Sequence, residues 1–114
     1  MDTRTKIVPR EEAVRLAAEG AMVVTGYFDP LLAWHAERLR GLKRAGAPLM
    51  VAIADPQDPI LPARARAELV AGLAVVDYAV ESCEGLTADV GLEEEDMRRL
   101  DELIEHVHAR QLAR

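Results

Sequence analysis

The stretch that decides the fold is VVTGYFDPLLAWH, residues 23–35. A β-branched run ends at Gly26, and the following Asp29 and Pro30 are residue types that favour the first positions of a helix. A strand, a glycine-containing turn and a helix start are the parts of a phosphate-binding turn, because the N–H groups at the start of a helix attract an anion. Trp34, however, stands directly before His35, where such a turn requires open space.

Strands and helices alternate on either side of this stretch. Apolar runs predict strands at residues 21–26, 49–55 and 75–80, and amphipathic or capped segments predict helices at residues 9–20, 30–45, 63–73 and 93–111. This order predicts an α/β fold with a Rossmann-like, doubly wound parallel sheet covered by helices on both faces, and residues 1–114 are expected to form a single domain. In such a sheet the ligand crevice lies beyond the carboxyl ends of the strands, where Gly26 and Asp55 are placed.

Composition argues against several classes of protein. The formal net charge of −6 argues against binding nucleic acid, and the longest apolar run, LMVAIA, is too short to cross a membrane. There is no signal-peptide pattern, and the single cysteine, Cys83, is expected to be a structural thiol, so the predicted compartment is the cytoplasm. Residues 37–66 hold six basic and three acidic side chains, whereas residues 81–105 hold ten acidic and two basic ones. We interpret these segments as two solvated faces, the alternative being positive potential beside a phosphate site.

The order of motifs resembles the cytidylyltransferase-like nucleotidyltransferases over about residues 6–80. Members of that family read roughly GxFDLLHxGH, followed by a helix, a strand that ends in Asp, an RAE helix and VDYV. The resemblance is greatest to the adenylyltransferase domain of ADP-heptose synthase. The matching positions are Gly26, Phe28, Asp29, Leu31, His35, Asp55, Arg66, Ala67, Glu68, Val76, Asp77 and Tyr78.

The resemblance implies transfer of a nucleotidyl group from a nucleoside triphosphate to a sugar or alcohol phosphate, with release of pyrophosphate. A Mg²⁺ ion would accompany the triphosphate, and no metal site of the protein's own is expected. His35 aligns with the second histidine of the family's His-x-Gly-His signature and is the predicted catalytic residue. The resemblance also implies a homodimer. The predicted nucleotide-binding residues are Gly26, Tyr27, Phe28, Asp29, Trp34, Asp55 and Arg66.

Two positions of the signature depart from the family pattern. Leu32 replaces the first histidine and donates no hydrogen bond to the transferring phosphate, a loss that typically costs about 100- to 1,000-fold in rate. Trp34 replaces the glycine, and its indole either fills the place of the nucleoside or points outward toward a partner. The segment after the last predicted strand is rich in acids, which repel a triphosphate. We therefore predict a degenerate site with weak or no catalysis and a role in nucleotide binding or protein interaction. The alternative is an active nucleotidyltransferase that uses His35, the loop amides and Arg66.

Each candidate residue also has a purely structural interpretation. His35 can be a core histidine, Asp29 is first a helix cap, and Asp55 can form a turn at the end of a strand. A doubly wound domain unrelated to the family also stays open. We expect the apolar stripe of the last helix to pack on the domain's own sheet, with a dimer interface as the alternative. This stripe consists of Met97, Leu100, Leu103, Ile104 and Val107.

Overall fold

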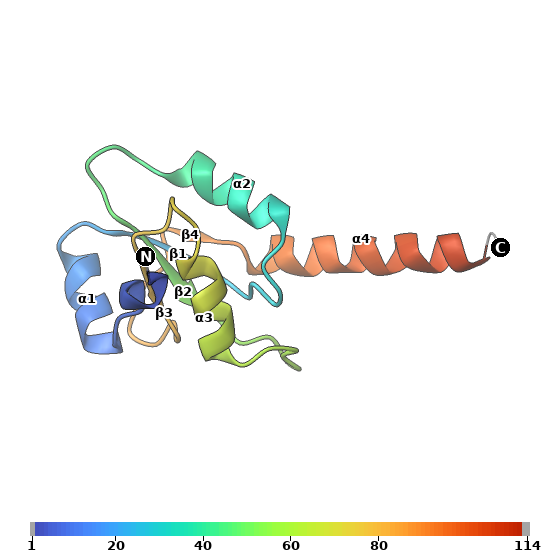
Figure 1. The fold of residues 1–114 in the computed structure, drawn as a ribbon, viewed down its shortest axis with the longest axis horizontal. Coiled ribbons are helices and arrows are strands. Elements are labelled where there is room, and N and C mark those ends of the chain that lie inside the picture. Colours follow the sequence, from blue (N-terminus) through green and yellow to red (C-terminus); the bar gives the residue numbers. More distant parts are fainter. Residues whose placement is uncertain (1, 113–114) are drawn as a thin grey trace.

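The computed structural model describes residues 2–112 (Figure 1). Its centre is a four-stranded sheet in the order β3-β2-β1-β4, in which every neighbouring pair is parallel. The strands are β1 (Met22–Gly26), β2 (Leu49–Ile53), β3 (Tyr78–Val80) and β4 (Val90–Gly91). The helices are the 3-10 helix η1 (Thr3–Lys6) and the α-helices α1 (Arg10–Ala18), α2 (Ala33–Leu42), α3 (Ala63–Ala71) and α4 (Glu93–Leu112). The predicted α/β fold with a parallel sheet is confirmed.

Helices cover both faces of this sheet, because the side chains of its buried strands alternate between two cores. On one face, Leu39 of α2 and Val70 of α3 belong to the same cluster as Val51 of β2. On the other face, Leu16 of α1 packs in a second cluster with Met50, the neighbour of Val51 in β2. All five residues of β1 and of β2 are buried, as near-continuous apolar runs predict for central parallel strands.

The start of α2 differs from the prediction. The helix begins at Ala33 instead of residue 30, and Asp29 is not its N-cap. The carboxylate of Asp29 instead accepts the backbone N–H groups of Ile60 and Leu61, at 2.6 and 2.8 Å. The N-cap is Leu32, whose side chain has no acceptor, and the ring of His35 at the third helical position accepts the Leu32 N–H. A contact distant in sequence has thus outcompeted the local capping preference of an aspartate.

The edges of the sheet also correct the prediction. The third strand is confined to Tyr78–Val80, and residues 75–77 precede it outside any strand. The two-residue strand β4 was not predicted, since residues 85–91 were expected to be a loop. It is held beside β1 by Asp89, whose carboxylate accepts the Val23 N–H at 2.7 Å. A strand of two residues is too short to show a periodic pattern, so the sequence gives no signal for it.

Helix α4 projects away from the globular part of the chain (Figure 1). The molecule measures 54 Å along its longest axis and 29 and 28 Å along the others. Side chains in the first turn of α4 are partly buried, but every residue from 97 to 110 is exposed. The prediction that the stripe of the last helix packs on the domain's own sheet is therefore wrong. Among the described residues, no helix combines the length and apolarity needed to cross a membrane.

Candidate functional site

The carboxyl ends of β1 and β4 meet the beginning of α4. From β1 the chain passes to β2 on one side, and after β3 it returns to β4 on the other side. Ligand crevices of open parallel sheets form at such a change of direction, beyond the carboxyl ends of the strands. In this chain the position is taken by the loop that follows Gly26 and by the first turn of α4.

A hydrogen-bond network centred on Asp96 occupies this position, and we call it the Asp96 network. One carboxylate oxygen of Asp96 accepts the Tyr27 N–H at 2.8 Å, and the other is bound to Nε2 of His35. Because Nδ1 of His35 accepts the Leu32 N–H at 2.9 Å, Nδ1 carries no proton and Nε2–H donates to Asp96. The side chains of His35 and Asp96 are 2% and 8% exposed. Both ring nitrogens and the Tyr27 N–H are therefore already paired within the chain.

The indole of Trp34 covers this network instead of pointing into solvent. It stacks on the ring of His35, with ring centroids 3.9 Å apart and an interplanar angle of 28°. The guanidinium of Arg99, a residue of α4, lies 5.3 Å from the centroid of the indole ring, within cation–π range. The indole Nε1 is buried and has no hydrogen-bond partner among the described residues, which marks an uncompensated cost at this position.

The loop glycine is required by the chain's own packing. A Cβ atom at Gly26 would lie 2.8 Å from the ring of Phe28 and 3.2 Å from Oδ2 of Asp96. Phe28 is fully buried and has a φ of 48°, a region that residues other than glycine rarely adopt. The close approach of Phe28 and Asp96 therefore accounts for Gly26 without a ligand.

Arg66 is a buried clamp that connects three loops. Its guanidinium donates to the carbonyl oxygens of Tyr27, Ala54 and Leu61 at 3.0, 2.8 and 2.9 Å, and to the carboxylate of Asp55 at 2.7 Å. The Arg66 side chain is 1% exposed. Since these carbonyls belong to the segments after β1, after β2 and before α3, Arg66 fixes the loops around the site. These bonds use four of the five N–H donors of the guanidinium, and a phosphate would have to reach the fifth in a side chain that is almost fully buried.

The two candidate aspartates have different partners. Asp29 anchors residues 60 and 61 through two backbone N–H groups, whereas the side chain of Asp55 is 71% exposed and pairs with Arg66. Among residues 2–112, no group of three or more His, Cys, Asp or Glu side chains is placed to hold a metal ion. Each oxygen of the Asp29 carboxylate already accepts a backbone N–H, so a Mg²⁺ ion bound there would share the carboxylate with Ile60 and Leu61.

A small apolar cavity lies beside the Asp96 network. Its volume is about 190 Å³, and it is enclosed by residues of the 27–35 loop, the 56–60 segment and the near end of α4. Pockets that hold small-molecule ligands usually measure about 300–1,000 Å³. The cavity is therefore smaller than most pockets that hold small-molecule ligands.

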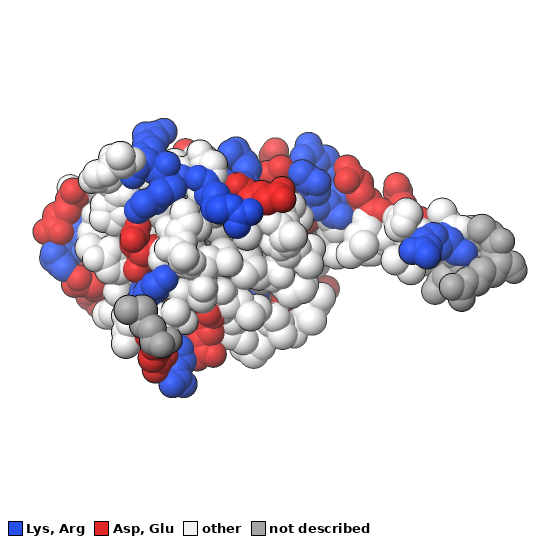
Figure 2. All heavy atoms as spheres, turned by 45° about the horizontal axis from the view of Figure 1, so that its top comes forward, with Lys and Arg blue, Asp and Glu red and all other residues white. Residues whose placement is uncertain are grey.

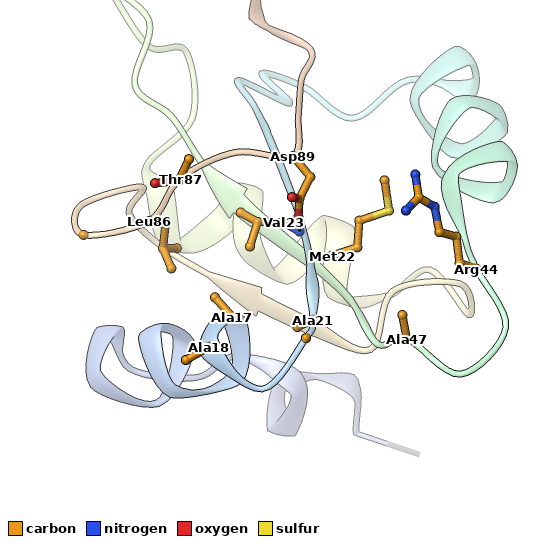
Figure 3. A pocket seen from close by; sticks show the side chains of 12 residues that line it. Ala17, Ala18, Ala21, Met22, Val23, Arg44, Ala47, Leu86, Thr87 and Asp89 are labelled. Carbon is orange, nitrogen blue, oxygen red and sulfur yellow. Dashed lines mark hydrogen bonds between the residues drawn. The ribbon is translucent and has the colours of Figure 1, made fainter.

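A larger hollow of about 480 Å³ lies at the opposite end of β1, between α1 and the 85–89 loop (Figure 3). It is open and lined mainly by small side chains such as Ala17 and Ala21, with Arg44 on the side of Met22. Its carboxylate, Asp89, already accepts the Val23 N–H. This hollow contains none of the predicted site residues and lies at the amino end of the strand, away from the usual ligand crevice.

The basic and acidic segments of the chain partly neutralise each other. Arg38 of α2 lies 3.7 Å from Glu95 of α4, and Arg64 of α3 lies 3.5 Å from Glu81. Figure 2 shows basic side chains gathered over the α2 side of the molecule, with acidic and basic side chains alternating along α4. Such exposed pairs stabilise little, but they reduce the positive potential that a phosphate would encounter near α2.

Cys83 and Asp77 have altered pKa values. Burial raises the pKa of the Cys83 thiol to about 11, with a smaller contribution from the charges of Glu93 and Asp55. Cys83 donates to the carbonyl of Ala52 at 3.6 Å, as expected of a structural thiol. For Asp77, burial raises the pKa, but the Lys43 ammonium and the Leu49 N–H outweigh it and lower the pKa below its usual value.

Asp96 is the central residue that the sequence analysis did not identify. Acidic residues in the first turn of a helix are common because they complement the helix dipole, so the run Glu93, Glu94, Glu95 and Asp96 had a sufficient local explanation. What sets Asp96 apart is that its partners, Tyr27 and His35, precede it by 69 and 61 residues. No local pattern carries that information.

Compared with models of known protein families and with the sequences of curated proteins, the chain has no match. The resemblance to cytidylyltransferase-like proteins therefore rests on the positions quoted above. The ligand-binding roles of the predicted site residues stay predictions.

Proposed function

We propose that this chain is a Rossmann-like domain of the nucleotidyltransferase kind that has lost catalysis and acts through protein interaction. The proposal is supported by the parallel sheet, by the strand–loop–helix unit at the carboxyl end of β1, and by the family-like positions along the sequence. It is also supported by the state of the site, in which the Tyr27 N–H, the Leu32 N–H and both ring nitrogens of His35 are hydrogen-bonded within the chain.

The observation that carries the proposal is the carboxylate of Asp96 on the N–H of Tyr27. In a phosphate-binding turn this N–H would donate to a phosphate oxygen. Here the carboxylate oxygen stands in for that phosphate oxygen, so the anion site is occupied by a residue of the same chain. An incoming triphosphate would have to displace a buried carboxylate that is hydrogen-bonded both to the Tyr27 N–H and to His35.

His35 is also withdrawn from chemistry. For its ring to contact a phosphate, it would have to leave both Asp96 and the Leu32 N–H, and the second bond helps to define the start of α2. Leu32, at the position of the other signature histidine, has no donor that could replace it. The stacking of Trp34 on His35 and the small volume of the neighbouring cavity support the same interpretation.

The proposal is tested by titrating the chain with ATP or CTP in the presence of Mg²⁺ and following the fluorescence of Trp34, the chain's one tryptophan. We expect no saturable change in the wild-type chain at millimolar nucleotide. Asp96→Ala frees the Tyr27 N–H and should produce saturable binding. Glu94→Ala removes an exposed charge from the same turn and serves as the matched control, with no binding expected.

A repair experiment separates closure by Asp96 from occlusion by Trp34. Leu32→His with Trp34→Gly should restore little affinity while Asp96 still holds the loop amide, and adding Asp96→Ala should increase it. Calorimetry is the readout, because these variants lack the tryptophan. Saturable binding and pyrophosphate release by the wild-type chain would establish the active alternative instead. A triple variant that folds but still binds no nucleotide would refute the proposed relationship to nucleotidyltransferases.

A further inference from the structure

The projecting part of α4 carries an uncovered apolar stripe. Residues 97–110 are all exposed, and charged side chains lie mainly along the other side of the helix (Figure 2). A helical segment of this length is marginal in water without tertiary packing, so the stripe needs a surface to cover it. The exposed fractions along it are 48% for Met97, 38% for Leu100, 50% for Leu103, 48% for Ile104 and 44% for Val107.

The near half of this stripe forms one wall of an apolar groove. The small cavity beside the Asp96 network opens between the globular part and α4. Two side chains on the globular wall are themselves exposed, Leu32 by 40% and Ile60 by 70%. We call this surface the apolar groove. It is formed by Leu32, Trp34 and Ile60 on the globular side and by Met97, Leu100 and Leu103 on α4.

We propose that a second copy of this chain covers the stripe, with the two α4 helices packed antiparallel so that the far half of each helix lies in the apolar groove of the other copy.

The two halves of α4 differ in what lies opposite their apolar side chains. The near half faces the globular part across the apolar groove, and no described side chain of the same copy fills the groove. Ile104 and Val107 in the far half lie beyond the groove and have no facing surface among the described residues of the same copy. A two-fold axis near residue 102 places Met97 beside the partner's Val107 and Leu100 beside the partner's Ile104. Leu103 then meets its own counterpart close to the axis. Each copy thus supplies what the other lacks, as an isologous interface requires.

Charge selects the antiparallel arrangement. The first turn of α4 contains four acids, Glu93–Asp96, whereas the far half contains one acid, Glu105, together with His106, His108 and Arg110. Antiparallel packing brings each acidic end beside the other copy's basic end and opposes the two helix dipoles. Parallel packing would instead place the two acidic first turns together, which like-charge repulsion disfavours.

The apolar area is sufficient for a stable pair. The exposed fractions of the five stripe residues, Leu32 and Ile60 correspond to on the order of 600 Å² of apolar side-chain surface per copy, or about 1,200 Å² in total, at the lower limit for specific protein–protein interfaces. The tryptophan and charged residues around the groove would add to this area. We therefore expect a dimer that forms at micromolar concentrations.

Sedimentation equilibrium of the full chain tests the proposal. We expect twice the chain mass of 12.5 kDa, and at least a tenfold weaker association for Leu103→Glu combined with Ile104→Glu. Val14→Glu is the matched control, because Val14 is 42% exposed on α1, away from α4, and its replacement should leave the dimer intact. A wild-type monomer at tens of micromolar, or a dimer indifferent to the double substitution, would overturn the proposal.

Cysteine cross-linking tests the orientation. In a Cys83→Ala background, mixed chains carrying either Met97→Cys or Val107→Cys should form a disulfide-linked heterodimer under mild oxidation. Neither variant alone should cross-link, while Leu103→Cys alone should do so. Efficient cross-linking of Val107→Cys with itself would show a parallel pair and refute the arrangement. Circular dichroism of each variant establishes that it is folded.

Discussion

Replacing Arg66 with methionine tests whether Arg66 is a structural clamp or a phosphate ligand. Methionine retains much of the apolar stem of the side chain, so the change mainly removes the guanidinium. Its removal leaves three carbonyl oxygens, of Tyr27, Ala54 and Leu61, without their donor. Each buried acceptor left unpaired costs about 1–3 kcal/mol. Allowing for water reaching one of them, we expect Arg66→Met to lower the free energy of unfolding by about 3–5 kcal/mol.

The assay is urea denaturation followed by far-UV circular dichroism. With a typical denaturant dependence of about 1–3 kcal/mol per molar urea, the midpoint should fall by roughly 2 M. Arg64→Met on the same helix is the control, because Arg64 is 53% exposed and its partners Glu68 and Glu81 are also at the surface. It should change stability by about 0.5 kcal/mol or less. A loss below about 1 kcal/mol for Arg66→Met, with an unchanged denaturant dependence, would refute the clamp.

Three further predictions concern single residues. Gly26→Ala should lower stability by about 1–3 kcal/mol, because its Cβ would collide with the ring of Phe28. Gly41→Ala in α2 has free space around the new Cβ and should raise stability by about 0.5–1 kcal/mol. Thermal melts of the two variants test both values. The pKa of Asp77 is lowered in the folded chain, so its contribution to stability is present above the usual value of 3.8 and is lost as the pH falls through the folded-state pKa. In urea titrations, Asp77→Asn should therefore destabilise the chain at pH 7 and make little difference well below pH 3.8. The raised pKa of Cys83, about 11, predicts slow alkylation by iodoacetamide at pH 8 that accelerates toward pH 11 and on unfolding in urea; rapid alkylation of the folded chain at pH 8 would contradict it.

The central part of the fold could be predicted because its signals are local. The run LMVAIA matches β2, which ends at Ile53, and the predicted starts of α3 and α4 at residues 63 and 93 agree with the structure. The start of α2 could not be predicted in the same way. Asp29 followed by Pro30 has the local form of a helix start, but the N–H groups of Ile60 and Leu61, some thirty residues later, compete for the carboxylate.

The candidate site could be placed from sequence, but the state of its donors could not. Gly26, His35 and Trp34 do lie together at the carboxyl end of β1, as the order of elements implies. That the loop amide is closed depends on Asp96, which reaches it only because α4 begins directly after β4. The stripe of α4 was misplaced for a similar reason, since an amphipathic pattern predicts that a face is covered without saying which surface covers it.

The claim that an internal carboxylate holds the anion site is tested most directly at the Tyr27 amide. A ¹⁵N–¹H correlation spectrum of the wild-type chain, recorded while Mg-ATP or inorganic tripolyphosphate is added to millimolar concentration, contains a separate resonance for that N–H. The account predicts a resonance typical of an amide bound to a carboxylate, with a position that does not move as the anion is added. A progressive, saturable displacement of the Tyr27 resonance would mean that phosphate reaches the loop in the native chain, and that Asp96 does not close it.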